Sequence, residues 1–121
     1  MKFCWSTLRV KNLEESIAFY TEIIGLEVAR RFNGGPSKEI VFLGDSETKI
    51  ELVCDGESRD TNVGKDISWG FETESLDKAL ELVKEKGIPV VSGPIQPNPH
   101  VKFFFIKDPD GMLIQLVEHM A

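Results

Sequence analysis

The chain has 121 residues, 41% hydrophobic and 28% charged, which is the length of one domain able to bury a core without disulfide bonds. Its 6 prolines and 10 glycines exclude disordered, collagen-like and low-complexity classes. The net charge is −6 and the basic residues are scattered along the chain, so we expect no nucleic-acid partner.

The sequence shows no membrane or secretion signal. Apolar runs such as Phe103 to Ile106 are too short to cross a bilayer, and Met1 to Val10 lacks the apolar region and cleavage site of a signal peptide. We therefore expect a cytoplasmic protein that has no membrane partner. Cys4 and Cys54 form no CxxC pair, so we expect two small buried side chains rather than a disulfide or a thiolate metal site.

The first half begins with a strand-like stretch, Phe3 to Val10, and continues with a helix. Asn12 can cap that helix with Glu15 at its third position. Gly25 ends it. Its apolar residues recur at helical spacing: Leu13, Ile17, Tyr20 and Ile24.

The second half repeats this order. A strand-like stretch, Ile67 to Thr73, precedes Ser75, which can cap a second helix that ends at Gly87 and Pro89. One face of this helix carries Leu76, Ala79, Leu80 and Val83.

Three strand signals and matching turns follow each helix. The strands are 27–32, 39–43 and 49–54 in the first half, and 89–92, 101–106 and 112–118 in the second. Gly34–Ser37 corresponds to a loop from Gly93 to Pro99, and Gly44–Glu47 to Asp108–Gly111. The sequence therefore predicts an α+β fold of two tandem βαβββ modules joined by the polar stretch Asp55 to Lys65.

Strand alternation predicts which side chains face away from the helices. In the first module these are Trp5, Thr7, Arg9 and Glu51, while Leu8, Val10, Ile50 and Leu52 lie under the helix. Superposing the halves places Ser68 on Trp5 and Gln115 on Glu51, at offsets of 63 and 64 residues. Polar side chains on an inward surface favour a cavity, and Phe103 and Phe105 would add apolar wall to it.

Two segments resemble signatures of one superfamily. Leu8 to Tyr20, followed by Ile24-Gly25-Leu26, is similar to the N-terminal signature of the glyoxalase-like, or vicinal oxygen chelate, superfamily, and Asp108 to Gly111 with Ile114-Gln115-Leu116 resembles the end of its second module. The resemblance implies one domain over 1–121, with modules 1–56 and 66–121 forming a curved sheet cavity. It also implies a homodimer, which is the commonest assembly.

The resemblance implies that four positions correspond to those at which glyoxalase I members hold a divalent metal. In this sequence these positions are occupied by Trp5, Glu51, Ser68 and Gln115. Only Glu51 keeps the ligand type, because an indole offers no lone pair, a neutral hydroxyl is a poor ligand and an amide oxygen is uncharged. His100 and His119 occupy none of the four positions. We therefore expect no metal cofactor and no ordinary glyoxalase I activity.

Two functions stay open. The first is a metal-free protein, similar to bleomycin-resistance proteins, that binds a cationic or aromatic small molecule; Trp5 would stack on it, although Trp5 could equally fill the space of the metal. The second is a lactoylglutathione-lyase-like isomerase or lyase that uses Glu51 as base, with Arg9 or a non-standard Ni, Zn, Co or Mn ion as electrophile. We also expect an ion pair between Glu51 and Arg9, which a purely structural role would explain as well.

In the ligand-binding hypothesis, the other polar side chains of the expected cavity orient the ligand. Ser68 and Gln115 can donate and accept hydrogen bonds there, and buried water would satisfy them equally well. The residues that we expect to contact the ligand are Trp5, Thr7, Arg9, Ser68, Phe103, Phe105 and Gln115.

Overall fold

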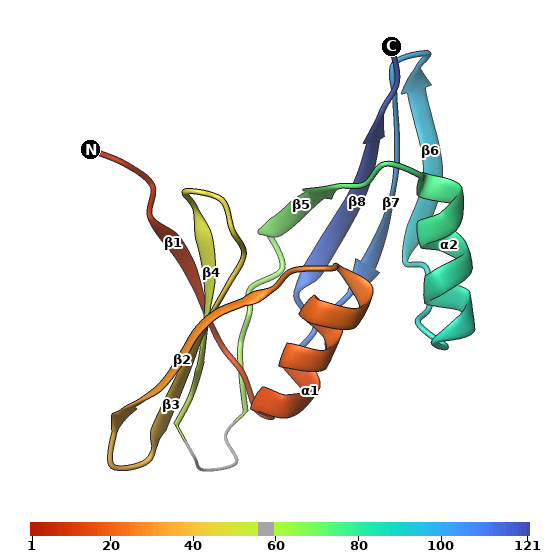
Figure 1. The fold of residues 1–121 in the computed structure, drawn as a ribbon. Coiled ribbons are helices and arrows are strands. Elements are labelled where there is room, and N and C mark those ends of the chain that lie inside the picture. Colours follow the sequence, from red (N-terminus) through yellow and green to blue (C-terminus); the bar gives the residue numbers. More distant parts are fainter. Residues whose placement is uncertain (56–59) are drawn as a thin grey trace. The chain divides into compact units, whose positions relative to one another are not determined.

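The computed structural model describes residues 1–55 and 60–121. The chain divides into two compact units, Met1–Val63 and Gly64–Ala121, each with the element order βαβββ (Figure 1). The predicted α+β class with tandem modules is confirmed. Of the expected connection Asp55 to Lys65, residues 56–59 lie outside the described part.

Unit 1 is a four-stranded mixed sheet with a helix against one face (Figure 1). The strand order is β1-β4-β3-β2, in which β1 runs parallel to β4 and the other pairs are antiparallel. The elements are β1 Trp5–Arg9, α1 Leu13–Ala18, β2 Val28–Gly35, β3 Lys38–Leu43 and β4 Lys49–Cys54.

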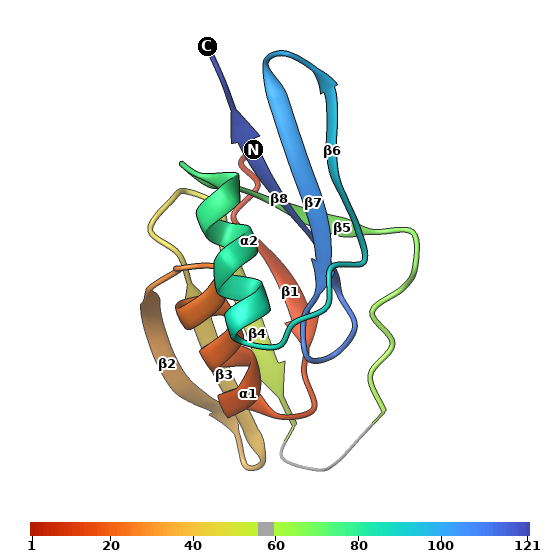
Figure 2. The same ribbon diagram turned by 90° about the vertical axis from the view of Figure 1, so that its right-hand side faces the viewer.

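Unit 2 repeats this topology with the strand order β5-β8-β7-β6, and Figure 2 shows β8, β7 and β6 side by side. Its parallel pair starts at Ser68 opposite Leu113, as the first starts at Trp5 opposite Lys49, which reproduces the expected offsets of 63 and 64 residues. The elements are β5 Ser68–Glu72, α2 Leu76–Glu85, β6 Ser92–Asn98, β7 Val101–Lys107 and β8 Leu113–His119.

Both helices begin where their capping residues predict. The Asn12 side chain accepts a hydrogen bond from the Glu15 amide at 3.0 Å, and the Ser75 hydroxyl accepts one from the Lys78 amide at 3.2 Å. These bonds satisfy amides that the first turn of a helix leaves without a partner. At the end of α2, Gly87 adopts φ +72°, a left-handed conformation that favours glycine.

The first helix differs from the expected single α-helix through to Ile24. After Ala18 the backbone continues as a π-helix, Phe19–Ile23, and the Ile24 amide donates to the Phe19 carbonyl five residues earlier at 3.2 Å. The Thr21 hydroxyl donates to the Ile17 carbonyl at 2.7 Å and competes with the regular backbone bonds there. The wider turn buries Phe19 beside Tyr20.

Strand alternation places the two cores as predicted. Leu8, Val10, Ile50 and Leu52 are all buried on the α1 side of the first sheet. The α2 side of the second sheet buries Phe104, Ile106, Ile114 and Leu116. Each helix therefore covers one face of its sheet and leaves the opposite face to other contacts.

The strand expected at 89–92 is wrong. The strand that follows α2 is instead β6, Ser92–Asn98. Most of it lies in the segment that was expected to be a loop. Pro94 and Pro97 have no amide hydrogen to donate, but β6 is the edge strand, where such residues are tolerated. Its pairing with β7 is irregular, with shifts around Ile95. The prolines and glycine of this segment therefore led to the prediction of a loop where the structure has an edge strand.

Arg31 connects α1 to the first sheet. Its guanidinium donates to Glu39 of β3 at 2.5 Å and also pairs with Glu14 of α1. The hydrogen bond that Arg31 donates to Glu39, and after it the one to Glu14, raise the pKa of Arg31 above its ordinary value. Arg31 points to the helix side of β2, so its neighbours Arg30 and Phe32 point to the other side.

The expected burial of the cysteines is wrong. Cys4 is exposed ahead of β1, and Cys54 is half-buried at the end of β4, where its thiol lies 3.7 Å from the Lys11 carbonyl. Both thiols are free. Neither helix in the described ranges is long and apolar enough to cross a membrane.

Replacing Gly93 by Ala should destabilise the protein by about 1–3 kcal/mol, because a non-glycine residue is strained at φ +97° and the new Cβ would lie 3.0 Å from the Phe103 carbonyl oxygen. Gly44→Ala is the matched control, since φ is +106° but nothing lies within 4 Å. Urea denaturation of both variants measures the difference. Equal losses would contradict the steric argument.

Candidate functional site

The expected ligand residues of unit 1 lie on the side of the sheet opposite α1, which we call the open face. Trp5, Thr7 and Arg9 alternate along β1 with the buried Leu8, and all three are exposed. Glu51 comes from the neighbouring strand β4, is half-buried, and is the direct cross-strand partner of Thr7. The sequence pattern therefore assigned these four side chains to the correct face.

Glu51 is held by Thr7. The Thr7 hydroxyl donates to a Glu51 carboxylate oxygen at 2.6 Å, a short bond of the charge-assisted kind. A carboxylate can accept several hydrogen bonds, so Glu51 keeps capacity for a donor from a ligand. The bond fixes the position of the carboxylate beside Trp5, which starts the same strand as Thr7.

A cluster of three aromatic rings lies next to Glu51. Phe42 of β3 is the cross-strand partner of Glu51, and the Trp5 ring meets Phe42 edge-on at 5.3 Å between centroids. Phe32 of β2 stacks on Phe42 at 6.2 Å. Phe42 is buried, whereas Trp5 is 49% exposed and Phe32 36% exposed. The three rings form an apolar platform whose outer members remain accessible.

Arg30 borders this platform. It is the cross-strand partner of Phe42, and its guanidinium lies 4.8 Å from the Phe32 ring centroid and 5.7 Å from that of Phe42. Phe32, Phe42 and Arg30 were not among the residues predicted to contact a ligand. Extending strand alternation from β4 to β3 and β2 would have placed all three on the open face, but only once the antiparallel register was known.

The expected ion pair between Arg9 and Glu51 is wrong. Arg9 pairs instead with Asp55, which follows the last residue of β4. Arg9 lies opposite Val53 in the sheet, two residues along β4 from Glu51, so its long side chain reaches the end of that strand rather than its middle. Among residues 1–55 and 60–121, the hydrogen-bond partner of Glu51 is therefore the neutral Thr7 hydroxyl.

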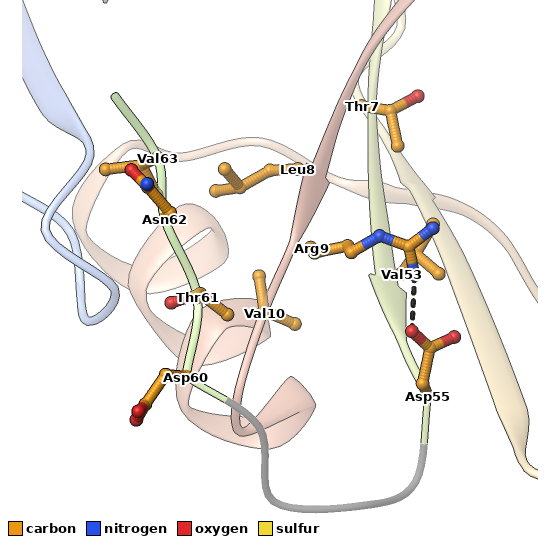
Figure 3. A pocket seen from close by; sticks show the side chains of 10 residues that line it. All are labelled: Thr7, Leu8, Arg9, Val10, Val53, Asp55, Asp60, Thr61, Asn62 and Val63. Carbon is orange, nitrogen blue, oxygen red and sulfur yellow. Dashed lines mark hydrogen bonds and ion pairs between the residues drawn. The ribbon is translucent and has the colours of Figure 1, made fainter. Parts of the chain in front are cut away.

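A cavity of about 300 Å³ opens along the edge of β1 (Figure 3). Figure 3 shows segment 60–63 running beside β1, with the Arg9 and Asp55 side chains joined on the other side. This volume is at the lower limit of small-molecule pockets. The cavity is lined by Thr7, Leu8, Arg9, Val10, Val53, Asp55, Asp60, Thr61, Asn62 and Val63. Thr7 thus connects the cavity with Glu51.

The second sheet carries the other expected residues on its face opposite α2. Ser68 is exposed at the start of β5, and Gln115 is half-buried in the middle of β8. Phe105 is the cross-strand partner of Gln115, and Phe103 lies one pair further along, with its ring edge-on to Phe105 at 5.8 Å. Alternation again assigned the face correctly.

The two sheets also carry polar side-chain pairs at equivalent places. Glu72 ends β5 and His119 ends β8, and the His119 Nδ1 lies 2.6 Å from a Glu72 carboxylate oxygen. The repeat offsets relate Glu72 to Arg9 and His119 to Asp55, so the acidic and basic members are exchanged between the units. The sequence analysis did not predict either pair, although the offsets would have identified the second from the first.

The residues at the four metal positions do not fit a divalent ion. Trp5 has only an N–H donor, while Ser68 and Gln115 offer neutral oxygens, so Glu51 is the one anionic ligand. Within residues 1–55 and 60–121, no group of three His, Cys, Asp or Glu side chains is placed to hold a metal.

The comparison with known families places the chain in a superfamily. The family model of the Glyoxalase/Bleomycin resistance protein/Dioxygenase superfamily matches residues 3–116, and the chain belongs to this superfamily. Lactoylglutathione lyase of Salmonella typhimurium is 30% identical over 128 residues, covering 98% of this chain and 93% of that enzyme. The lactoylglutathione lyase of Neisseria meningitidis is also 30% identical, over 126 residues and with 98% and 91% coverage.

Solved structures of different function share the fold. Glyoxalase I of Leishmania major has a TM-score of 0.84 at 23% identity, covering 98% of this chain and 86% of that one. An antibiotic binding protein from Streptomyces has a TM-score of 0.75 at 19% identity, with 99% and 97% coverage. At these identities the likeness shows the fold alone, so function must be argued from side chains.

The resemblance to glyoxalase I assigns four positions to a metal, and the triple variant Trp5→His, Ser68→His, Gln115→Glu restores imidazole and carboxylate ligands at three of them. On the basis of that resemblance we predict that the variant gains affinity for Ni²⁺ or Zn²⁺. Calorimetric titration of the purified variant measures this. The control is Trp5→Phe, Ser68→Ala, Gln115→Ala, which adds no metal ligand. Equal metal binding by the wild type and the restored variant would show that the four positions are mapped wrongly.

Proposed function

We propose that this protein binds a planar aromatic small molecule on the open face of unit 1 without a divalent metal. The observation that carries the proposal is Trp5, a half-exposed indole held edge-on by Phe42 beside the Glu51 carboxylate. A half-exposed indole leaves apolar ring surface that a bound aromatic ligand can cover. A flat ligand stacked on Trp5 provides that cover.

The contact with Phe42 favours a stacking role for Trp5. It orients the indole before any ligand binds, so less side-chain entropy is lost on binding. The alternative role, in which Trp5 fills the space of a missing metal, would be met by a fully buried ring. Trp5 is instead 49% exposed.

Glu51 gives the proposed site a polar anchor. Thr7 occupies one acceptor position of its carboxylate, and a ligand N–H or ammonium group can take another. The net charge of −6 also favours the approach of cations. A ligand with an aromatic body and a hydrogen-bond donor therefore matches the site.

We also propose an oligomeric state, a cellular location and a class of partner for the protein. We propose a homodimer, in line with the base rate for assemblies, located in the cytoplasm. The excess of 20 acidic over 14 basic residues supports the absence of nucleic-acid partners, and we propose no membrane partner.

Trp5→Ala should weaken binding of 2-naphthylacetamide about tenfold, whereas Trp5→Phe should weaken it no more than about threefold, because phenylalanine still presents an aromatic face. Titration followed by NMR in chelator-treated buffer measures both affinities. Trp69→Phe, which alters the other tryptophan, is the control and should leave binding unchanged.

Two results would contradict the binding proposal. One is equal affinity in wild type and Trp5→Ala. The other is a stoichiometric Ni, Zn, Co or Mn ion in protein purified without chelator, together with loss of naphthylacetamide binding when that ion is removed.

A lyase or isomerase function is the second candidate, favoured by the names of relatives at 30% identity that span nearly the whole chain. Glu51 would act as the base, since its carboxylate is held in a fixed position by Thr7. Arg9 is engaged with Asp55, so this candidate needs another electrophile, such as a non-standard divalent metal.

If the second candidate is right, Glu51→Gln should lower the rate of S-lactoylglutathione formation from methylglyoxal and glutathione at least about a hundredfold, the usual contribution of a general base. The same assay with added Ni²⁺, Zn²⁺, Co²⁺ or Mn²⁺ shows whether a metal supports the activity. Glu47→Gln, a change of exposed surface charge, is the control. The lyase candidate is rejected if wild type shows no turnover with any of the four ions.

A further inference from the structure

Arg30 stands out among the arginines that the structure describes. Arg9 is paired with Asp55, and Arg31 with Glu14 and Glu39. Arg30 makes no ion pair or hydrogen bond within residues 1–55 and 60–121, and its described contacts are with the Phe32 and Phe42 rings. A guanidinium has five N–H donors, so one that lies over aromatic rings keeps its outer donors available.

The position of Arg30 relates it to the proposed binding site. The sheet register aligns Thr7, Glu51, Phe42 and Arg30 in one row across β1, β4, β3 and β2. Adjacent strands are about 4.8 Å apart, so the backbones of Glu51 and Arg30 are roughly 10 Å apart with Phe42 between them. The Glu51 carboxylate and the Arg30 guanidinium therefore come from the two strands on either side of Phe42.

We propose that Arg30 is an anion-binding residue of this site, and that the ligand is an aromatic carboxylate whose ring covers the Trp5–Phe42 platform while its carboxylate pairs with the Arg30 guanidinium. The planar fork of arginine matches a carboxylate with two parallel hydrogen bonds. Any ammonium group of the ligand lies at the opposite end, beside Glu51. The inference rests on the proposed function and narrows its ligand class.

Stacking gives Arg30 an advantage over a flexible surface cation. Contact with Phe32 at 4.8 Å restricts the guanidinium before the ligand arrives, which lowers the entropy lost on binding. Arg31, one residue later, faces the helix side and has both its acidic partners in place. Adjacent arginines on opposite faces of β2 therefore have different roles: Arg31 stabilises the fold and Arg30 binds the ligand.

The test compares two probes that differ mainly in charge, 2-naphthylacetate and its neutral amide 2-naphthylacetamide. Wild type should bind the acid at least about fivefold more tightly than the amide at low salt. This preference for the acid should shrink at about 0.5 M salt, because salt screens the exposed charges of Arg30 and the carboxylate. Arg30→Gln should abolish the preference. Arg31→Gln, which removes the same charge from the other face, should retain it, with circular dichroism confirming that both variants fold.

A second measurement observes Arg30 directly. The Nε–H NMR signal that disappears in Arg30→Gln should shift on titration with the acid and not with the amide. Equal affinities for acid and amide in wild type, or an acid preference that survives in Arg30→Gln, would overturn the inference.

The two proposals fail in different ways. If the amide binds in a Trp5-dependent manner but the acid is not preferred, the aromatic site stands and the role of Arg30 falls. If the acid binds through Arg30 while Trp5→Ala changes neither affinity, the anion site stands and the stacking proposal falls.

Discussion

One constraint determines the rest of this structure: in each unit a helix buries one face of a four-stranded sheet, and side chains alternate strictly between the two faces. Once Leu8 and Leu52 are committed to the core, Thr7 and Glu51 must lie on the opposite face. A shift of one residue in β1 or β4 would expose the core and bury the carboxylate. The parallel β1–β4 pair is therefore fixed by packing, and the site inherits its geometry from that packing.

The same constraint separates the position of a site residue from its chemistry. Trp5 and Ser68 start equivalent strands, and Glu51 and Gln115 occupy equivalent places in the partner strands. Their location depends on the buried residues beside them and not on what they bind, so evolution can exchange their side chains without disturbing the core. The exchanged acidic and basic residues of the pairs Arg9–Asp55 and Glu72–His119 follow the same rule.

Short sequence patterns correctly predicted the features that depend only on neighbouring residues. The caps at Asn12 and Ser75, the buried faces and the assignment of Trp5, Thr7 and Glu51 to one face all follow from short-range spacing. The strand at 92–98 was missed because its prolines are acceptable only at a sheet edge, which is a tertiary property. The Phe42–Arg30 cluster and the partner of Arg9 depended on antiparallel register and side-chain reach, neither of which a single sequence specifies.

Magnitudes indicate what kind of function this site can support. A bound metal ion contributes several kcal/mol by polarising substrate oxygens. An aromatic contact contributes about 0.5–1.5 kcal/mol beyond the area it buries, and it acts on the ground state as much as on any transition state. An indole at a position that the resemblance assigns to a metal ligand therefore favours our proposal of ligand binding over the lyase candidate. Membership of a superfamily whose fold serves both enzymes and an antibiotic binding protein is compatible with this reading, because in such a fold the side chains decide the outcome.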